Sequence, residues 1–165
     1  MTMANNEKDR PGCGNPEEKL ILIVDDDEAV WDLLYYIVRK EGFKVEKATD
    51  GGEALDKARI LHPELILLDL MLPTHGGFEI LRELQEGDTC NIPIVIITSR
   101  YLDRSTSEML KQEPNVKDFM EKPVKPEVLA ARLHTLLKTR PPLKTTGDKS
   151  VVPEFKRSSE YEKPG

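Results

Sequence analysis

The stretch "LILIVDDDEAV" (20–30) places five apolar residues directly before three aspartates and a glutamate. A short, continuous apolar run is typical of a strand that is buried on both faces of a sheet. Neighbouring acids repel one another, and burial of any of them adds a desolvation cost unless a cation lies nearby. The stretch therefore predicts a buried strand that ends at a site for positive charge.

Short apolar runs alternate with helical patterns along the rest of the chain. Strands are predicted at 20–24, 43–48, 64–69, 92–98 and 116–121, and helices at 27–42, 50–63, 76–87, 101–113 and 125–138. Alternation of this kind favours a parallel sheet that right-handed crossovers cover with helices on both faces. The predicted fold class is α/β, with a five-stranded, doubly wound parallel sheet.

The composition divides the chain into a body and two tails. Residues 20–138 are predicted to form one domain, residues 1–19 a disordered tail, and residues 139–165 a mostly disordered tail. The 27 residues after Lys138 are too few for a usual DNA-binding or enzymatic output domain, so we expect a stand-alone module.

Charge and cysteine use exclude several classes of protein. The body carries 22 acidic and 15 basic residues, which disfavours direct nucleic-acid binding. Cys13 and Cys90 lie far apart and indicate neither a disulfide framework nor a metal site. No apolar run approaches the roughly 20 residues of a membrane helix, and the N-terminus lacks a secretory signal. We expect a cytoplasmic protein without membrane insertion.

Polar side chains follow four of the predicted strands, at the edge where doubly wound sheets place their ligands. These residues are Asp25, Asp26, Asp69, Thr98 and Lys122. Clustered carboxylates suit Mg²⁺. A lysine and a hydroxyl suit phosphoryl oxygens, and phosphoryl transfer needs mainly positioning and charge stabilisation. Asp69, which is alone at the end of its strand, is the candidate nucleophile.

Four motifs carry a family resemblance: "ILIVDDD" (21–27), "LILLDLMLPTHGG" (65–77), "IVIITS" (94–99) and "DFMEKPVKP" (118–126). Taken together and in this order, they resemble the receiver domain of two-component response regulators, over roughly residues 19–139. The chain looks like a stand-alone receiver of the chemotaxis type. The resemblance implies a flavodoxin-like (βα)5 fold with strand order 2-1-3-4-5.

The resemblance also implies roles for individual residues. Asp69 is then the phosphoacceptor, which takes its phosphoryl group from a histidine kinase or a histidine phosphotransfer protein. The implied Mg²⁺ ligands are Asp25, Asp26, Asp69 and the backbone carbonyl of Met71. Lys122 would contact the phosphoryl group, and the Lys122–Pro123 peptide would be cis.

Thr98 and Phe119 are the implied switch residues, which move when Asp69 is phosphorylated. The chain would then change its binding to an unknown downstream protein, or form a homodimer. Two departures from the family pattern bear on that output: Ser99 stands where many receivers have alanine, and the loop before the last strand reads "EPNVKDF" (113–119).

Two other functions compete with this interpretation. A phosphatase with an aspartyl nucleophile usually has a second aspartate two residues later, where this chain has Met71. A pseudo-receiver that binds partners without phosphorylation usually lacks some of the acidic or lysine positions, all of which are present. The chain is therefore predicted to be a signalling protein rather than an enzyme. His62, His75 and His134 are predicted to be surface or loop residues.

Overall fold

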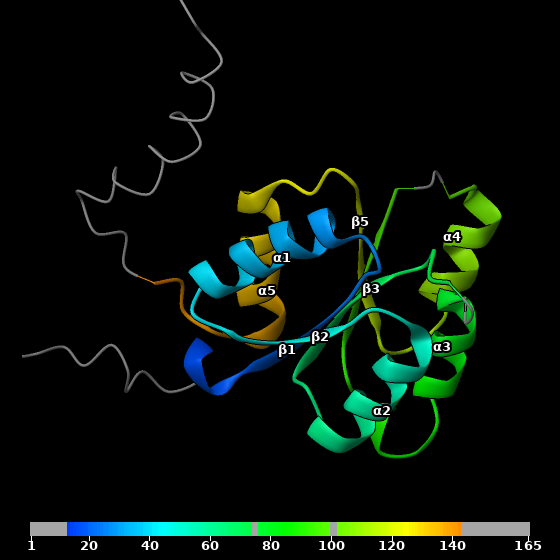
Figure 1. Ribbon diagram of the computed structural model, residues 1–165, viewed down its shortest axis with the longest axis horizontal. Coiled ribbons are helices and arrows are strands. Elements are labelled where there is room, and N and C mark those ends of the chain that lie inside the picture. Colours follow the sequence, from blue (N-terminus) through cyan, green and yellow to red (C-terminus); the bar gives the residue numbers. More distant parts are fainter. Residues whose placement is uncertain (1–12, 74–75, 100–101, 143–165) are drawn as a thin grey trace, which may run out of the picture.

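The sheet of the computed structural model has five parallel strands in the order β2-β1-β3-β4-β5 (Figure 1). The structure describes residues 13–73, 76–99 and 102–142. The strands are β1 (Leu20–Val24), β2 (Lys44–Ala48), β3 (Leu65–Asp69), β4 (Ile94–Thr98) and β5 (Val116–Glu121). The predicted fold class and strand order are confirmed.

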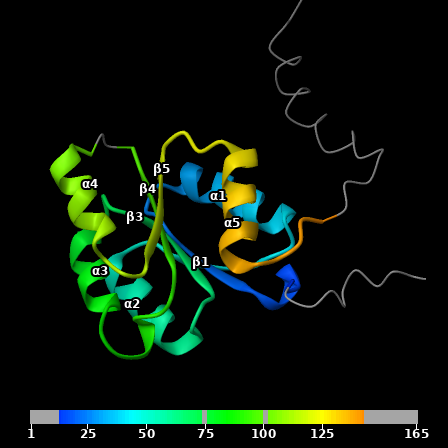
Figure 2. The ribbon, with the colours of Figure 1, turned by 180° about the vertical axis from the view of Figure 1, so that it is seen from behind.

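In the described part of the chain, five α-helices cover the two faces of the sheet (Figures 1 and 2). They are α1 (Glu28–Lys40), α2 (Gly51–Leu61), α3 (Gly77–Leu84), α4 (Arg104–Lys111) and α5 (Pro126–Leu137), with short 3₁₀ helices η2 (Pro16–Glu18) and η3 (Gly87–Thr89). The side chains of α1 and α5 form one core cluster with the sheet. Those of α2, α3 and α4 form a second cluster on the opposite face.

Local sequence explains where the elements begin. The apolar runs of β1, β3 and β4 are buried almost throughout, because helices cover both of their faces. Helices α1, α2 and α4 each follow an aspartate, at Asp27, Asp50 and Asp103, whose carboxylate accepts a backbone N–H of the first turn. The prediction that Asp27 and Glu28 begin the first helix is confirmed.

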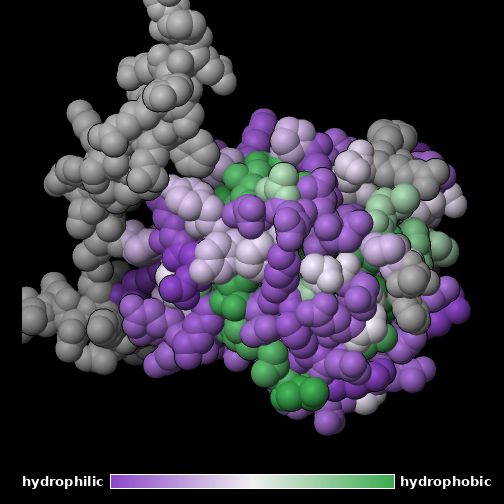
Figure 3. Space-filling model, viewed as in Figure 1, coloured by the Kyte–Doolittle hydropathy of each residue, from purple (hydrophilic) through white to green (hydrophobic). Residues whose placement is uncertain are grey.

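The molecular surface in the view of Figure 1 is mostly hydrophilic, with separate hydrophobic patches (Figure 3). Within the described part of the chain, no helix combines the length and apolar character that crossing a bilayer requires.

Residues 13–19 differ from the disordered tail predicted for residues 1–19. They include η2, and Gly14 forms a parallel β-bridge with Thr139, which belongs to the segment predicted to be mostly disordered. Residues 1–12 and 143–165 lie outside the described residues. The polar composition of the segment misled the prediction, because its backbone partners, Lys44, Lys138 and Thr139, are distant in the sequence.

The surface prediction for His134 is wrong. This side chain is only 7% exposed, since it lies beside the Phe43 ring and bonds to both Glu41 and Thr139. His62 is exposed at the end of α2, as predicted. His75 lies outside the described residues.

Candidate phosphoacceptor and metal site

Asp25 follows directly after β1, Asp69 ends the neighbouring strand β3, and Lys122 follows directly after β5. The Lys122 Nζ lies 2.8 Å from Asp25 Oδ2 and 3.1 Å from Asp69 Oδ2. All three side chains are largely buried, with exposed fractions of 13% for Lys122, 1% for Asp25 and 5% for Asp69. One ammonium group is therefore shared between two buried carboxylates.

The backbone of the sheet holds Lys122 over this edge. Its N–H donates to the Thr98 carbonyl at 3.0 Å, which continues the pairing of Thr98 with Glu121 in β4 and β5. The next peptide, Lys122–Pro123, is cis, as the resemblance implied. Lys122 thus lies at the carboxyl end of the sheet, and its amine reaches across β4 to Asp69 and Asp25.

Burial of the Asp25 carboxylate raises its pKa. The contact with Lys122 Nζ, the hydrogen bond from the Asp27 N–H and the positive charge of Lys122 all lower that pKa, but it stays raised overall. Burial also lowers the pKa of the Lys122 ammonium, but its contacts with Asp25 and Asp69 outweigh that effect and leave the pKa raised. The lysine therefore stays charged, while the acidic pair carries more negative charge than one ammonium group neutralises.

The carboxylates fit a divalent cation. Asp25, Asp26 and Asp69 each offer an oxygen, and these oxygens all lie within 4.8 Å of one another. Asp25 Oδ2 is buried and lies close to Lys122 Nζ, and it has no hydrogen bond of acceptable geometry to any residue that the structure describes. Asp26 is exposed, so the cluster opens to solvent on its side. Hard cations such as Mg²⁺ prefer such oxygen ligands, which supports the predicted metal site.

The backbone after β3 positions the second oxygen of Asp69. The Met71 N–H donates to Asp69 Oδ1 at 3.0 Å, so each Asp69 oxygen has its own cationic or N–H donor. The Met71 side chain is 50% exposed beside this edge. The role of the Met71 backbone carbonyl as a metal ligand stays a prediction.

Gly77 packs the start of α3 against the same loop. Its N–H donates to the Leu70 carbonyl at 3.0 Å, and a Cβ atom at this position would lie 2.5 Å from the Leu70 Cα. Only a glycine allows this approach of two backbone segments. Because Leu70 lies between Asp69 and Met71, the close contact helps to fix the backbone geometry around Asp69.

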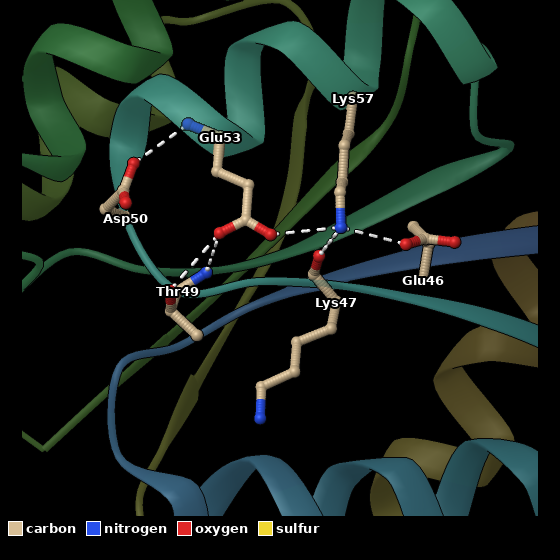
Figure 4. A network of polar contacts seen from close by, with 6 residues as sticks. All are labelled: Glu46, Lys47, Thr49, Asp50, Glu53 and Lys57. Atoms are coloured by element: carbon tan, nitrogen blue, oxygen red, sulfur yellow. Dashed lines mark hydrogen bonds and ion pairs between the residues drawn. The ribbon is translucent and has the colours of Figure 1, made fainter.

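The Asp25 N–H donates to the Ala48 carbonyl at the end of β2. A polar network lies directly after this point, between β2 and α2 (Figure 4). Thr49 donates its N–H and hydroxyl to Glu53, and Lys57 Nζ contacts Glu53, Glu46 and the Lys47 carbonyl. Burial raises the pKa of Glu53, but hydrogen bonds from Lys57 and Thr49 outweigh it and lower that pKa overall. Sequence reasoning missed this network, although the four-residue spacing of Glu53 and Lys57 on one helix was a usable signal.

The predicted switch residues lie at this end of β4 and within β5. Thr98 is buried with 3% of its surface exposed, and Phe119 is half-buried against the core cluster under α4. Ser99 is exposed. The structure thus brings Asp25, Asp26, Asp69 and Lys122 into one cluster, with Thr98 at the adjoining strand end.

Comparison with known proteins agrees with this geometry. A sequence model of the response regulator receiver domain matches residues 21–134. The chain belongs to the response regulator receiver family. Receiver domains bind Mg²⁺ at an acidic site and are phosphorylated by histidine kinases.

Two relatives illustrate the similarity. The alkaline phosphatase synthesis transcriptional regulatory protein PhoP of Bacillus subtilis is 38% identical over 120 residues, which are 73% of this chain and 49% of that protein. The DNA-binding response regulator MtrA of Mycobacterium tuberculosis (strain H37Rv) is 37% identical over 118 residues, 72% of this chain and 50% of that protein. The chain spans about half the length of these relatives.

Solved receiver structures share the fold. A CheY-like receiver domain protein from Methanospirillum hungatei has a TM-score of 0.66 and 31% identity, over 72% of this chain and 93% of that chain. The receiver domain of sensor histidine kinase PA1611 from Pseudomonas aeruginosa has a TM-score of 0.65 and 26% identity, over 72% and 97% of the two chains. That structure has a magnesium ion coordinated in its active site cleft.

Proposed function

We propose that Asp69 accepts a phosphoryl group from the phosphohistidine of a histidine kinase or a histidine phosphotransfer protein. The observation that carries the proposal is the buried Asp69 carboxylate, held between the Met71 N–H and Lys122 Nζ beside two further aspartates. An Asp69 oxygen forms a bond to phosphorus as the phosphorus–nitrogen bond breaks, and the imidazole leaves with the electron pair. Lys122 offsets the charge on the phosphoryl oxygens.

Asp25, Asp26 and Asp69 are the proposed carboxylate ligands of Mg²⁺, with the Met71 carbonyl as a backbone ligand. When bound, the ion neutralises charge on the phosphoryl oxygens. The oxygens of Asp25, Asp26 and Asp69, which all lie within 4.8 Å of one another, support this assignment independently of any reaction. Binding is measurable without phosphorylation, since Mg²⁺ is expected to raise the unfolding temperature of the wild type and much less that of Asp26→Asn.

The proposed output is a change in binding to another protein. Phosphorylation adds negative charge beside Thr98, whose hydroxyl is then drawn to the phosphoryl group, and the half-buried Phe119 ring changes rotamer. The acidic body disfavours a direct contact with nucleic acid. A homodimer of the phosphorylated chain is a second form of the same output, which sedimentation before and after phosphorylation distinguishes.

The chain is proposed to be a phosphoacceptor rather than an enzyme, with at most intrinsic autophosphorylation and autodephosphorylation. Met71 supports this, because it occupies the position of the general acid in aspartyl-nucleophile phosphatases. A cytoplasmic location is proposed from the histidine kinase donor and from two free cysteines, Cys13 and Cys90.

The test is the intact mass of the purified chain after incubation with acetyl phosphate, with and without Mg²⁺. We expect one phosphoryl adduct that requires Mg²⁺ and is absent in Asp69→Asn. An absent adduct in the wild type, also with a phosphorylated histidine kinase as donor, would support a binding module that works without phosphorylation.

A further inference from the structure

The end of the molecule opposite Asp69 holds a second cluster of buried polar groups. Strands β1 and β2 begin at this end, and α1 and α5 end there (Figure 1). His134 in α5 is buried, and its Nε2 lies 3.0 Å from Glu41 Oε1, just after α1. Its Nδ1 lies 2.8 Å from the hydroxyl of Thr139, which is also buried. The imidazole therefore joins the end of α1 to the segment that follows α5.

The segment before β1 joins the same cluster through its backbone. The Gly14 N–H donates to the Lys138 carbonyl at 2.7 Å, and Gly14 pairs with Thr139 in a parallel bridge. Lys138 has a φ of 52°, which turns the chain at the end of α5 and brings Thr139 N–H to the His134 carbonyl at 3.1 Å. The two ends of the described chain are thus bonded to each other.

Residues 15–19 are anchored separately. Pro16 packs on Gly42, where a Cβ atom would lie 3.2 Å from the Pro16 Cβ. The Lys19 carbonyl accepts the Lys44 N–H at 3.0 Å. Because residues 15–19 are held at both points, the Gly14 N–H has a defined position beside the Lys138 carbonyl.

We propose that Gly14, Glu41, His134, Lys138 and Thr139 form a basal clasp, a conformational device in which the N-terminal segment holds the chain after α5 against α1. The clasp fixes the path by which the chain enters the domain at residues 13–19 and leaves it at residues 138–142. The clasp has two halves, the hydrogen bond from Gly14 to Lys138 and the hydrogen bond between Thr139 and His134, and each depends on the other. Loss of the Gly14 bond increases local opening at Thr139, and loss of the Thr139 hydroxyl increases local opening at Gly14.

Amide hydrogen exchange in the full chain, followed by NMR, tests the first half of this dependence. Gly14→Pro removes the N–H that Lys138 accepts, whereas Gly14→Ala keeps it and places its Cβ atom 3.3 Å from the flexible end of Lys19. We expect Thr139 to exchange about tenfold faster in Gly14→Pro than in Gly14→Ala, the effect of one lost hydrogen bond on a local opening. Trypsin is expected to cut the Lys138–Thr139 bond faster in the proline variant.

The second half uses Thr139→Val, which keeps the shape of the side chain but lacks the hydroxyl, with Thr139→Ser as its control. The Gly14 amide is expected to exchange several-fold faster in the valine variant than in the serine variant. Equal exchange within each matched pair would overturn the proposal, since the contacts would then be independent. The valine pair keeps the proposal testable if Gly14→Pro does not fold.

Discussion

The two ends of the sheet both bury polar side chains, but they satisfy them differently. At the amino end, the His134 ring bonds through both nitrogens, and Gly14 and Thr139 complete the basal clasp. At the carboxyl end, one lysine faces two buried aspartates, so a single ammonium group is shared between two carboxylates. Satisfied groups stabilise one conformation. The unbalanced negative charge at the carboxyl end instead favours binding of a cation, together with the groups that the cation coordinates.

Removing the ammonium at the carboxyl end should have the largest effect on stability. Lys122→Met leaves two buried carboxylates unpaired, so we expect a loss of about 3 kcal/mol in the free energy of unfolding at pH 7. Urea denaturation measures it, with Lys111→Met on the exposed face of α4 as control. An equal, small loss in both variants would mean that the charges at this end are already balanced by solvent.

A methyl group at Gly77 should disturb the same end through packing alone. Gly77→Ala forces a Cβ atom against the Leu70 backbone, and we expect a loss of about 2 kcal/mol in the free energy of unfolding. The neighbouring Gly76→Ala is the matched control, because a Cβ atom there meets nothing within 4 Å. Urea midpoints of the two variants that agree within error would contradict a close contact at Leu70.

Neutralising Asp25 should stabilise the protein. Its pKa is raised by burial, so the folded state binds the proton more tightly than the unfolded state, and the stability this provides is present below the ordinary pKa and is lost as pH rises through the folded pKa. Asp25→Asn is therefore expected to gain unfolding free energy at pH 7, and the gain should fade as the pH falls through the raised folded pKa and be absent below the ordinary aspartate pKa of about 3.9. Urea titrations at several pH values measure it. A loss at pH 7 would show that the ion pair with Lys122 outweighs desolvation.

The smallest effect is expected at the satisfied end. Thr139→Val should lower the free energy of unfolding by about 1 kcal/mol, the usual net value of one hydrogen bond. The change in unfolding temperature on adding Mg²⁺ should match that of the wild type, because the clasp lies at the opposite end of the sheet. A smaller rise in unfolding temperature with Mg²⁺ than in the wild type would show that the two ends of the sheet are coupled.

Sequence patterns predicted the fold and the acidic site because both depend on local signals. Apolar runs mark the strands, and a parallel sheet brings the residues after those runs to one edge. Asp25, Asp69 and Lys122 could therefore be placed together without a structure. The sharing of Lys122 between two aspartates was not predictable, because it depends on side-chain reach across β4.

The basal clasp could not be predicted for a related reason. Glu41 and His134 are separated by 93 residues, and Gly14 contributes only its backbone N–H. No periodic pattern marks such partners, and the polar composition of residues 13–19 argued for disorder. The buried His134 shows the limit most clearly, since its partners are Glu41, just after α1, and Thr139, in the segment after α5.

The most direct test compares the phosphorylation of the wild type with that of two variants, one substituted at each end of the sheet. Intact masses would be followed over time with acetyl phosphate and Mg²⁺ for the wild type, Asp69→Asn and Gly14→Pro. We predict one phosphoryl adduct that forms at the same rate in the wild type and in Gly14→Pro, and none in Asp69→Asn. An adduct that persists in Asp69→Asn would contradict the assignment of Asp69 as the phosphoacceptor.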